Sequence, residues 1–216
     1  MTKECPARPD RLIFSSESPE IQALIRNDER LAWLIGRVGE LTIHLNPDPF
    51  QSLALSIVGQ QLSVKAAASI KERVLLLAPE FTPESLLALE PETLRGAGLS
   101  RAKVVSIHDL ASKTAARQLD FDRLEQMENE EIIEMVTDVK GIGRWTAEMF
   151  LMFSLGRPDV LSLGDFGLQR STKWLFGMED RPDKKYLEQH GHKWAPYRSA
   201  ASFYLWEAIN RGIINE

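Results

Sequence analysis

The stretch KGIGRWTAEMF, residues 140–150, is the most informative part of this sequence about the fold. An apolar helical pattern runs up to Val139, and a second one begins near Arg144. Between them, Gly141 and Gly143 permit backbone angles and close approaches that a side chain would block. The pattern predicts a helix–hairpin–helix motif. The second helix is apolar nearly all round, so we expect it to be buried, with these members: Trp145, Ala147, Met149, Phe150, Leu151 and Phe153.

Two interpretations of the glycine hairpin are open. Backbone N–H groups at the start of a helix point outward at the positive end of its dipole, which suits a phosphate group. The other interpretation is a tight turn between two core helices, and the glycines alone favour it. A dinucleotide-binding fingerprint is disfavoured, because a helix precedes the turn and Thr146 stands where the third glycine belongs.

Bulk composition narrows the class of protein. The chain has 216 residues and a net charge of -5, so its total charge gives no sign of nucleic-acid binding. The lone cysteine, Cys5, excludes a disulfide within the chain, a cysteine-bound zinc site and an iron–sulfur cluster. No apolar run approaches the roughly 20 residues that span a bilayer. We therefore expect an intracellular protein in a reducing compartment.

Helix-start signals recur along the chain. A capping side chain precedes each of four apolar helical patterns, at Asp48, Ser63, Thr82 and Ser100, and proline follows two of the caps. No hairpin-linked pair of alternating strands is evident; residues 41–45 form a short extended piece without an obvious partner. The expected fold class is all-α.

The segment LGRPDVLSLGDFGLQRS, residues 155–171, contains the candidate catalytic group. Gly156 and Pro158 end the preceding helix, and an apolar loop leads to Asp165 at the start of the next one. Asp165 is then either an ordinary N-cap, worth ~1 kcal/mol, or a carboxylate kept ionised in a cleft.

Four motifs occur along this chain in the same order as in one known family. They are the hairpin followed by Asp165, SIVGQQLSVKAA at 56–67, LRGAGLSRAKVVSIHDLA at 94–111 and WAPYRSAASFYLW at 194–206. Together they resemble the helix–hairpin–helix (HhH-GPD) DNA glycosylases, and within them the 3-methyladenine DNA glycosylase II (AlkA-type) branch. The resemblance covers roughly residues 48–211.

The resemblance implies a role for each matching residue. Asp165 corresponds to the catalytic aspartate. Trp145 and Trp206 correspond to aromatic faces of the base pocket, with Met149 where some relatives have a further aromatic. Gln61 and Leu62 fall at the loop that fills the gap left by a flipped nucleotide. The phosphate-binding hairpin comprises Lys140, Gly141, Gly143, Arg144 and Thr146; lysine stands at 140 where the family usually has proline. Backbone carbonyls of Thr137, Val139 and Ile142 match the ligands of a monovalent cation, Na⁺ or K⁺.

The position of Trp145 also implies a reaction subtype. Relatives that cut the DNA strand carry at this point a lysine that forms a Schiff base. The chain also lacks the four cysteines of relatives with an iron–sulfur cluster. The resemblance therefore implies a monofunctional glycosylase that excises alkylated bases, with deaminated bases as a second candidate class, and leaves an abasic site, with no required cofactor.

The implied architecture has two helical lobes and a cleft between them that holds Asp165. We expect one lobe at 49–155 and the other from 1–48 together with 156–216. The expected partner is double-stranded DNA with damaged bases, bound by a monomer in the cytoplasm, at the bacterial nucleoid, or in a eukaryotic nucleus. His190 and His192 are expected in a solvated loop. The alternatives are a non-catalytic hairpin module that binds DNA and, more remotely, a helical interaction protein.

Overall fold

The computed structural model describes residues 9–214, so Cys5 lies outside the described residues. The chain divides into two compact units, one formed by 46–150 and the other by the segments up to Leu45 and from Leu151 onward. Helices account for 63% of the structure, which confirms the all-α class. Within 9–214, no helix is both long enough and apolar enough to cross a bilayer.

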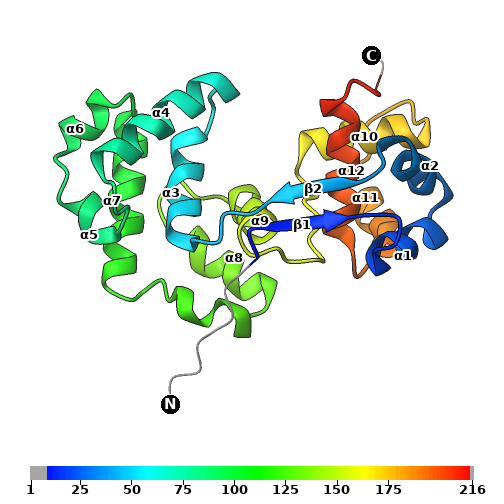
Figure 1. The fold of residues 1–216 in the computed structure, drawn as a ribbon, viewed down its shortest axis with the longest axis horizontal. Helices are drawn as coiled ribbons and strands as arrows, with labels where there is room; N and C mark the ends of the chain where they lie inside the picture. The colour runs from blue at the N-terminus through cyan, green and yellow to red at the C-terminus, as the bar shows by residue number, and fades with distance from the viewer. Residues whose placement is uncertain (1–8, 215–216) are drawn as a thin grey trace. The chain divides into compact units, whose positions relative to one another are not determined.

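The unit formed by 46–150 is built around the helix α7 (Arg101–Ala115), which packs against α3 (Pro49–Gly59) and α5 (Pro83–Leu87) (Figure 1). Leu53 and Ile57 of α3 and Ile107 and Leu110 of α7 are fully buried, and they form the centre of its core. The other elements of this unit are α3 (Pro49–Gly59), α4 (Val64–Leu77), α5 (Pro83–Leu87), α6 (Pro91–Gly96), the 3₁₀ helix η1 (Phe121–Gln126), α8 (Asn129–Thr137) and the first part of α9 (Arg144–Phe153).

The predicted helix caps of this unit are confirmed. Each capping side chain accepts a hydrogen bond from a backbone N–H in the first turn, which satisfies a donor that has no partner within the helix. The pairs are Asp48 with Gln51, Ser63 with Ala66, Thr82 with Ser85, and Ser100 with Lys103.

The other unit centres on α12 (Arg198–Asn210), whose middle section is buried on all sides. α12 packs against α1 (Pro19–Asn27), α2 (Glu29–Val38) and α10 (Phe166–Phe176). Burial all round explains why this helix lacks a polar face. The remaining elements are β1 (Arg11–Phe14), α1 (Pro19–Asn27), α2 (Glu29–Val38), β2 (Leu41–His44), α10 (Phe166–Phe176), α11 (Lys184–Gly191), the 3₁₀ helix η2 (His192–Trp194) and the last residues of α9.

A short antiparallel sheet belongs to this second unit. β1 and β2 pair with Arg11 opposite His44 and Phe14 opposite Leu41 (Figure 1). The extended piece expected at 41–45 therefore does have a partner. Two helices separate the strands in the chain, so no turn signal joins them.

Candidate active site and DNA-binding elements

The hairpin between α8 and α9 is a compact turn held by backbone hydrogen bonds. The N–H of Val139 donates to the carbonyl of Val136 at 3.2 Å, and the N–H of Ile142 donates to the carbonyl of Val139 at 3.1 Å. Gly141 has a φ of +81°, where L side chains are strained, and a Cβ there would collide with Oγ of Ser106. The two glycines differ, because a Cβ on Gly143 would meet no atom within 4 Å.

The two basic residues predicted for the hairpin, Lys140 and Arg144, both contact carboxylates of the protein itself. The guanidinium of Arg144 lies 2.6 Å from a carboxylate oxygen of Glu130 and 3.0 Å from one of Glu148. The hydrogen bond from Arg144 lowers the pKa of Glu130. The backbone N–H of Lys140 donates to Asp109 at 3.0 Å, while its ammonium group stays largely exposed.

Thr146 differs from the other hairpin residues, because its side chain is buried. Its hydroxyl oxygen lies 3.5 Å from Nε2 of Gln60. The structure therefore places the hydroxyl of Thr146 inside the unit and leaves Lys140 and Arg144 at its surface.

The predicted wedge residues lie on the turn between α3 and α4. Gln61 is exposed and has a φ of +56°, a backbone conformation uncommon outside glycine. Leu62 is 38% exposed, and Val64, at the start of α4, is 89% exposed. This turn offers both polar and apolar side chains to solvent.

Trp145 and Met149 lie one turn apart on α9, so their side chains face the same side of the helix. Met149 is half-buried, and Ala147, Phe150 and Leu151 are buried as expected. The expectation of burial all round is wrong for Trp145, which is 49% exposed. The helix presents a large aromatic surface at its N-terminal end.

Asp165 caps α10 and is half-buried. One carboxylate oxygen, Oδ1, accepts the N–H of Leu168 at 2.6 Å and the indole N–H of Trp206 at 2.8 Å. A Cβ on Gly167 would stand 3.2 Å from this oxygen and 3.3 Å from the Trp206 ring. Gly167 therefore keeps the space beside the carboxylate open, a role that the sequence analysis missed.

Trp206 is oriented by aromatic neighbours. Its ring stacks on Phe153 with centroids 5.9 Å apart and planes at 25°, and Phe203 lies 6.1 Å away. Phe153 and Phe203 thus fix the indole so that its N–H reaches the carboxylate of Asp165. The contact joins residues 41 positions apart in the sequence.

The predicted site residues fall into two groups. Asp165 and Trp206 meet in the unit that contains α10 and α12. The hairpin, the wedge turn, Trp145 and Met149 belong to the unit formed by 46–150.

His190 is not in a solvated loop, so that expectation is wrong. It lies on α11 with a side chain only 13% exposed, and its Nε2 is 3.1 Å from Oδ2 of Asp28. The fully buried Trp194 donates its indole N–H to the same oxygen at 2.9 Å. Burial would raise the pKa of Asp28, but hydrogen bonds from His190, Trp194 and the N–H of Leu31 outweigh it and lower the pKa to about 2.

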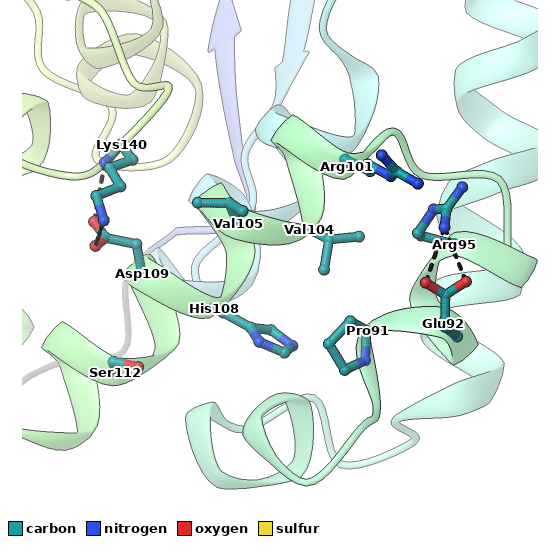
Figure 2. Close-up of a pocket in the computed structure, with 10 residues that line it drawn as sticks. All are labelled: Pro91, Glu92, Arg95, Arg101, Val104, Val105, His108, Asp109, Ser112 and Lys140. Atoms are coloured by element: carbon teal, nitrogen blue, oxygen red, sulfur yellow. Dashed lines mark hydrogen bonds and ion pairs between the residues drawn. The ribbon is translucent and has the colours of Figure 1, made fainter.

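A cavity of about 520 Å³ lies beside the hairpin in the unit formed by 46–150 (Figure 2). In Figure 2, Lys140 and Asp109 stand on one side of it and Arg95 and Glu92 on the other, with His108 between them. None of the residues assigned to the base pocket lines this cavity. Within 9–214, no group of three or more His, Cys, Asp or Glu side chains could hold a metal ion.

Comparisons with known proteins show which family this chain is similar to. Residues 54–197 match the sequence profile of the HhH-GPD superfamily of base excision DNA repair proteins. DNA-3-methyladenine glycosylase 1 of Schizosaccharomyces pombe is 34% identical over 204 residues, which are 92% of this chain and 90% of that protein.

Solved structures show the same fold. The crystal structure of DNA-3-methyladenine glycosidase from Bacillus halodurans has a TM-score of 0.86 and 46% identity, over 94% of each chain. The S. pombe 3-methyladenine DNA glycosylase in complex with abasic DNA has a TM-score of 0.80 and 31% identity, over 92% of this chain and all of that one.

Proposed function

The chain belongs to the HhH-GPD superfamily of base excision DNA repair proteins, and on that premise we propose that it is a DNA glycosylase that excises alkylated bases. The observation that carries this proposal is the Asp165 carboxylate, which is held by the N–H groups of Leu168 and Trp206. The relatives named above are 3-methyladenine glycosylases and match nearly the whole chain, which supports the same substrate class.

Asp165 would act on charge that develops during the reaction. Cleavage of an N-glycosidic bond builds positive charge on the sugar, and a preplaced carboxylate stabilises that charge and can orient the attacking water. Hydrogen bonds from Leu168 and Trp206 to one oxygen fix the direction of the carboxylate. The group would then be ready before substrate binds, without reorganisation during the chemical step.

The substrate is double-stranded DNA with a damaged base, and its recognition would use the other predicted residues. A base must leave the stack before its glycosidic bond becomes accessible. Gln61 and Leu62, exposed on their turn, would fill the resulting gap. Many alkylated purines are cationic, and the exposed ring of Trp145 offers a face to which a cation is attracted.

The hairpin would hold the DNA backbone. The open space at Gly143 lets a phosphate approach the N–H groups at the start of α9. Exposed Lys140 can add a direct charge contact, whereas Arg144 would have to share its guanidinium with Glu130 and Glu148. Backbone contacts of this kind need no basic surface, so a net charge of -5 is compatible with them.

A monovalent cation at the hairpin is part of the proposal. The carbonyls of Thr137, Val139 and Ile142 would hold it. Thr137 is the last residue of α8, where carbonyl oxygens lack partners within the helix and carry partial negative charge, which suits a cation. The carbonyl of Val139 accepts the N–H of Ile142 and retains a second lone pair for an ion. When bound, the ion would bring positive charge toward the DNA backbone.

We further propose that the enzyme is monofunctional, because Trp145 cannot form an imine with the sugar. Borohydride added during turnover should trap no covalent protein–DNA adduct. A trapped adduct together with spontaneous strand cleavage would contradict this part of the proposal.

A panel of lesions tests the proposed function. Purified protein is incubated with duplexes that carry 3-methyladenine, 7-methylguanine, 1-methyladenine, ethenoadenine or hypoxanthine, and alkali then reveals abasic sites. We expect release of at least one methylated purine. Tight DNA binding without release of any of these bases would favour the non-catalytic DNA-binding module instead.

A further inference from the structure

Lys103 makes two short contacts that the proposed chemistry does not use. It lies on α7, and its ammonium group donates to the carbonyls of Val58 at 2.8 Å and Gln60 at 2.7 Å. α3 ends at Gly59, so these carbonyls lie where a helix leaves its last acceptors without partners. Burial lowers the pKa of Lys103 below its usual 10.5. The ammonium group of Lys103 thus loses part of its hydration at this position, and in return the turn after α3 gains two charge-assisted hydrogen bonds.

Gln60 carries the connection from this turn to the hairpin. Its backbone carbonyl accepts from Lys103, and its side-chain amide donates to the carbonyl of Gly141 at 2.9 Å. The same nitrogen lies 3.5 Å from the hydroxyl oxygen of Thr146, in the first turn of α9. Gln60 directly precedes Gln61 and Leu62, so the predicted wedge is tied to the predicted phosphate-binding hairpin.

α7 supports both ends of this connection. Ser106, three residues after Lys103 and on the same side of the helix, leaves no room for a side chain at Gly141. Asp109 accepts the N–H of Lys140 at 3.0 Å. Lys113 ion-pairs with Asp138 at 2.6 Å, just after α8. One rigid helix therefore positions the wedge turn near its first residues and the hairpin along the rest of its length.

The turn needs such support because its backbone is strained. Gln61 has a φ of +56°, which costs energy for any residue except glycine and persists only where the surroundings enforce it. A wedge must enter the stack at a set distance from the phosphates that the hairpin holds. A shift of about 1 Å in a supporting group can cost as much as about 100-fold in rate.

We propose that Lys103 is a positioning residue for base flipping, which holds the Gln61–Leu62 wedge in register with the hairpin through Val58, Gln60 and Gly141. This inference rests on the proposed glycosylase function. Lys103 contacts neither the base nor the sugar in this proposal; it acts through the turn.

The test compares two substrates that differ in the base-pairing energy that opposes flipping. One duplex carries the lesion paired with its normal partner, and the other carries the same lesion opposite an abasic gap, where it is already unpaired. For Lys103→Met, loss of two charge-assisted hydrogen bonds should lower the single-turnover excision rate on the paired duplex by about 10-fold or more. On the unpaired lesion the rate should stay within about 3-fold of wild type, because pairing energy no longer opposes extrusion.

Three further variants complete the design. Lys103→Arg retains the charge and donors, so it should restore much of the rate on the paired duplex. Gln60→Met removes the side-chain contacts with Gly141 and Thr146 but keeps the backbone carbonyl that accepts from Lys103. This variant covers the case in which Lys103→Met fails to fold, and it should show the same preference for the unpaired lesion. Lys185→Met removes one exposed positive charge on α11 and should resemble wild type on both substrates.

Equal losses on the two substrates for both Lys103→Met and Gln60→Met would overturn the inference and leave these residues a purely structural role. Failure of the proposed function is distinguishable, since wild type would then release no base from either duplex. In that case 2-aminopurine beside the lesion reports unstacking directly. A smaller fluorescence gain with Lys103→Met than with wild type would support the inference, and an equal gain would overturn it.

Discussion

At the scale of single residues, Trp206 does more than provide an aromatic face. Its indole N–H lies 2.8 Å from Oδ1 of Asp165, while its ring is stacked on Phe153. The sequence resemblance assigned it to the base pocket and gave no sign of this hydrogen bond. Trp206 can therefore orient the carboxylate of Asp165 through its N–H while its ring borders the space beside that carboxylate.

Trp206→Phe isolates the hydrogen bond, because phenylalanine keeps an aromatic ring and lacks the N–H. A hydrogen bond to a charged group is worth about 1.5–3 kcal/mol, so we expect the single-turnover rate to fall by about 10-fold or more. Affinity for lesion-containing DNA should change little, and the comparison is made by single-turnover kinetics and fluorescence anisotropy. An unchanged rate would mean that the N–H does not contribute to the chemical step.

Trp145→Ala tests the exposed ring on α9. If the ring stacks on a cationic base, excision of methylated purines should fall more than excision of neutral hypoxanthine. A cation–π contact of ~0.5–2 kcal/mol corresponds to a difference of about 2- to 30-fold between the two substrates. Both rates are measured in the abasic-site assay. Equal losses would indicate that Trp145 only packs against the base.

At the scale of elements, the two glycines of the hairpin have separable roles. Gly141→Ala places a side chain at a φ of +81° and against Ser106, so it should destabilise folding by more than ~1 kcal/mol. Gly143→Ala adds a methyl group in open space, so it should fold normally. Its Cβ would meet only a bound phosphate, and affinity should therefore fall for damaged and undamaged DNA alike.

Equilibrium unfolding and DNA titrations at several salt concentrations check this contrast. The salt slope of wild type should be shallow, because backbone N–H groups release few counterions. Full affinity in Gly143→Ala together with a steep slope would place the DNA-binding surface elsewhere.

The contacts of Asp28 link α1 and α2 to α11. Because they depend on an ionised carboxylate, they predict how the stability of the protein changes in acid. The pKa of Asp28 is about 2, below the ordinary 3.8. Its ionised form thus contributes stability above pH ~4, and this is lost as pH falls from ~4 toward 2. The shift corresponds to about 2 kcal/mol of unfolding free energy.

Urea unfolding from pH 7 down to 2.5 measures this contribution. Asp28→Asn should be less stable at neutral pH and should lose less stability on acidification than wild type. Asp183→Asn is the matched control, since Asp183 also caps a helix but is exposed. An acid response in Asp28→Asn identical to that of wild type would show that other carboxylates govern the transition.

Local elements could be predicted from the sequence, and contacts between distant segments could not. Caps such as Ser100 and Asp165 act within one helical turn, so their signal is local. The partner of β2 lies two helices earlier, and the partners of His190 include Asp28 at the other end of the chain. Apolar periodicity also failed to show that Trp145 is exposed, because hydrophobic character alone does not distinguish a core residue from a binding surface.

At the scale of the whole molecule, the proposed reaction uses groups from both compact units. Asp165 and Trp206 supply the carboxylate and its orientation. The unit formed by 46–150 supplies the hairpin, the wedge turn and Trp145. The domain limits expected at residues 49 and 155 remain a prediction.

The most direct test of the account is base release from methylated duplex DNA by wild type and by Asp165→Asn. Asparagine keeps an oxygen for the N–H of Leu168 and removes the charge, so folding and DNA binding should persist. We predict that wild type releases methylated bases and leaves full-length strands that break only after alkali, and that Asp165→Asn binds the same DNA without measurable release. Release by Asp165→Asn at the wild-type rate would contradict the catalytic role of this carboxylate.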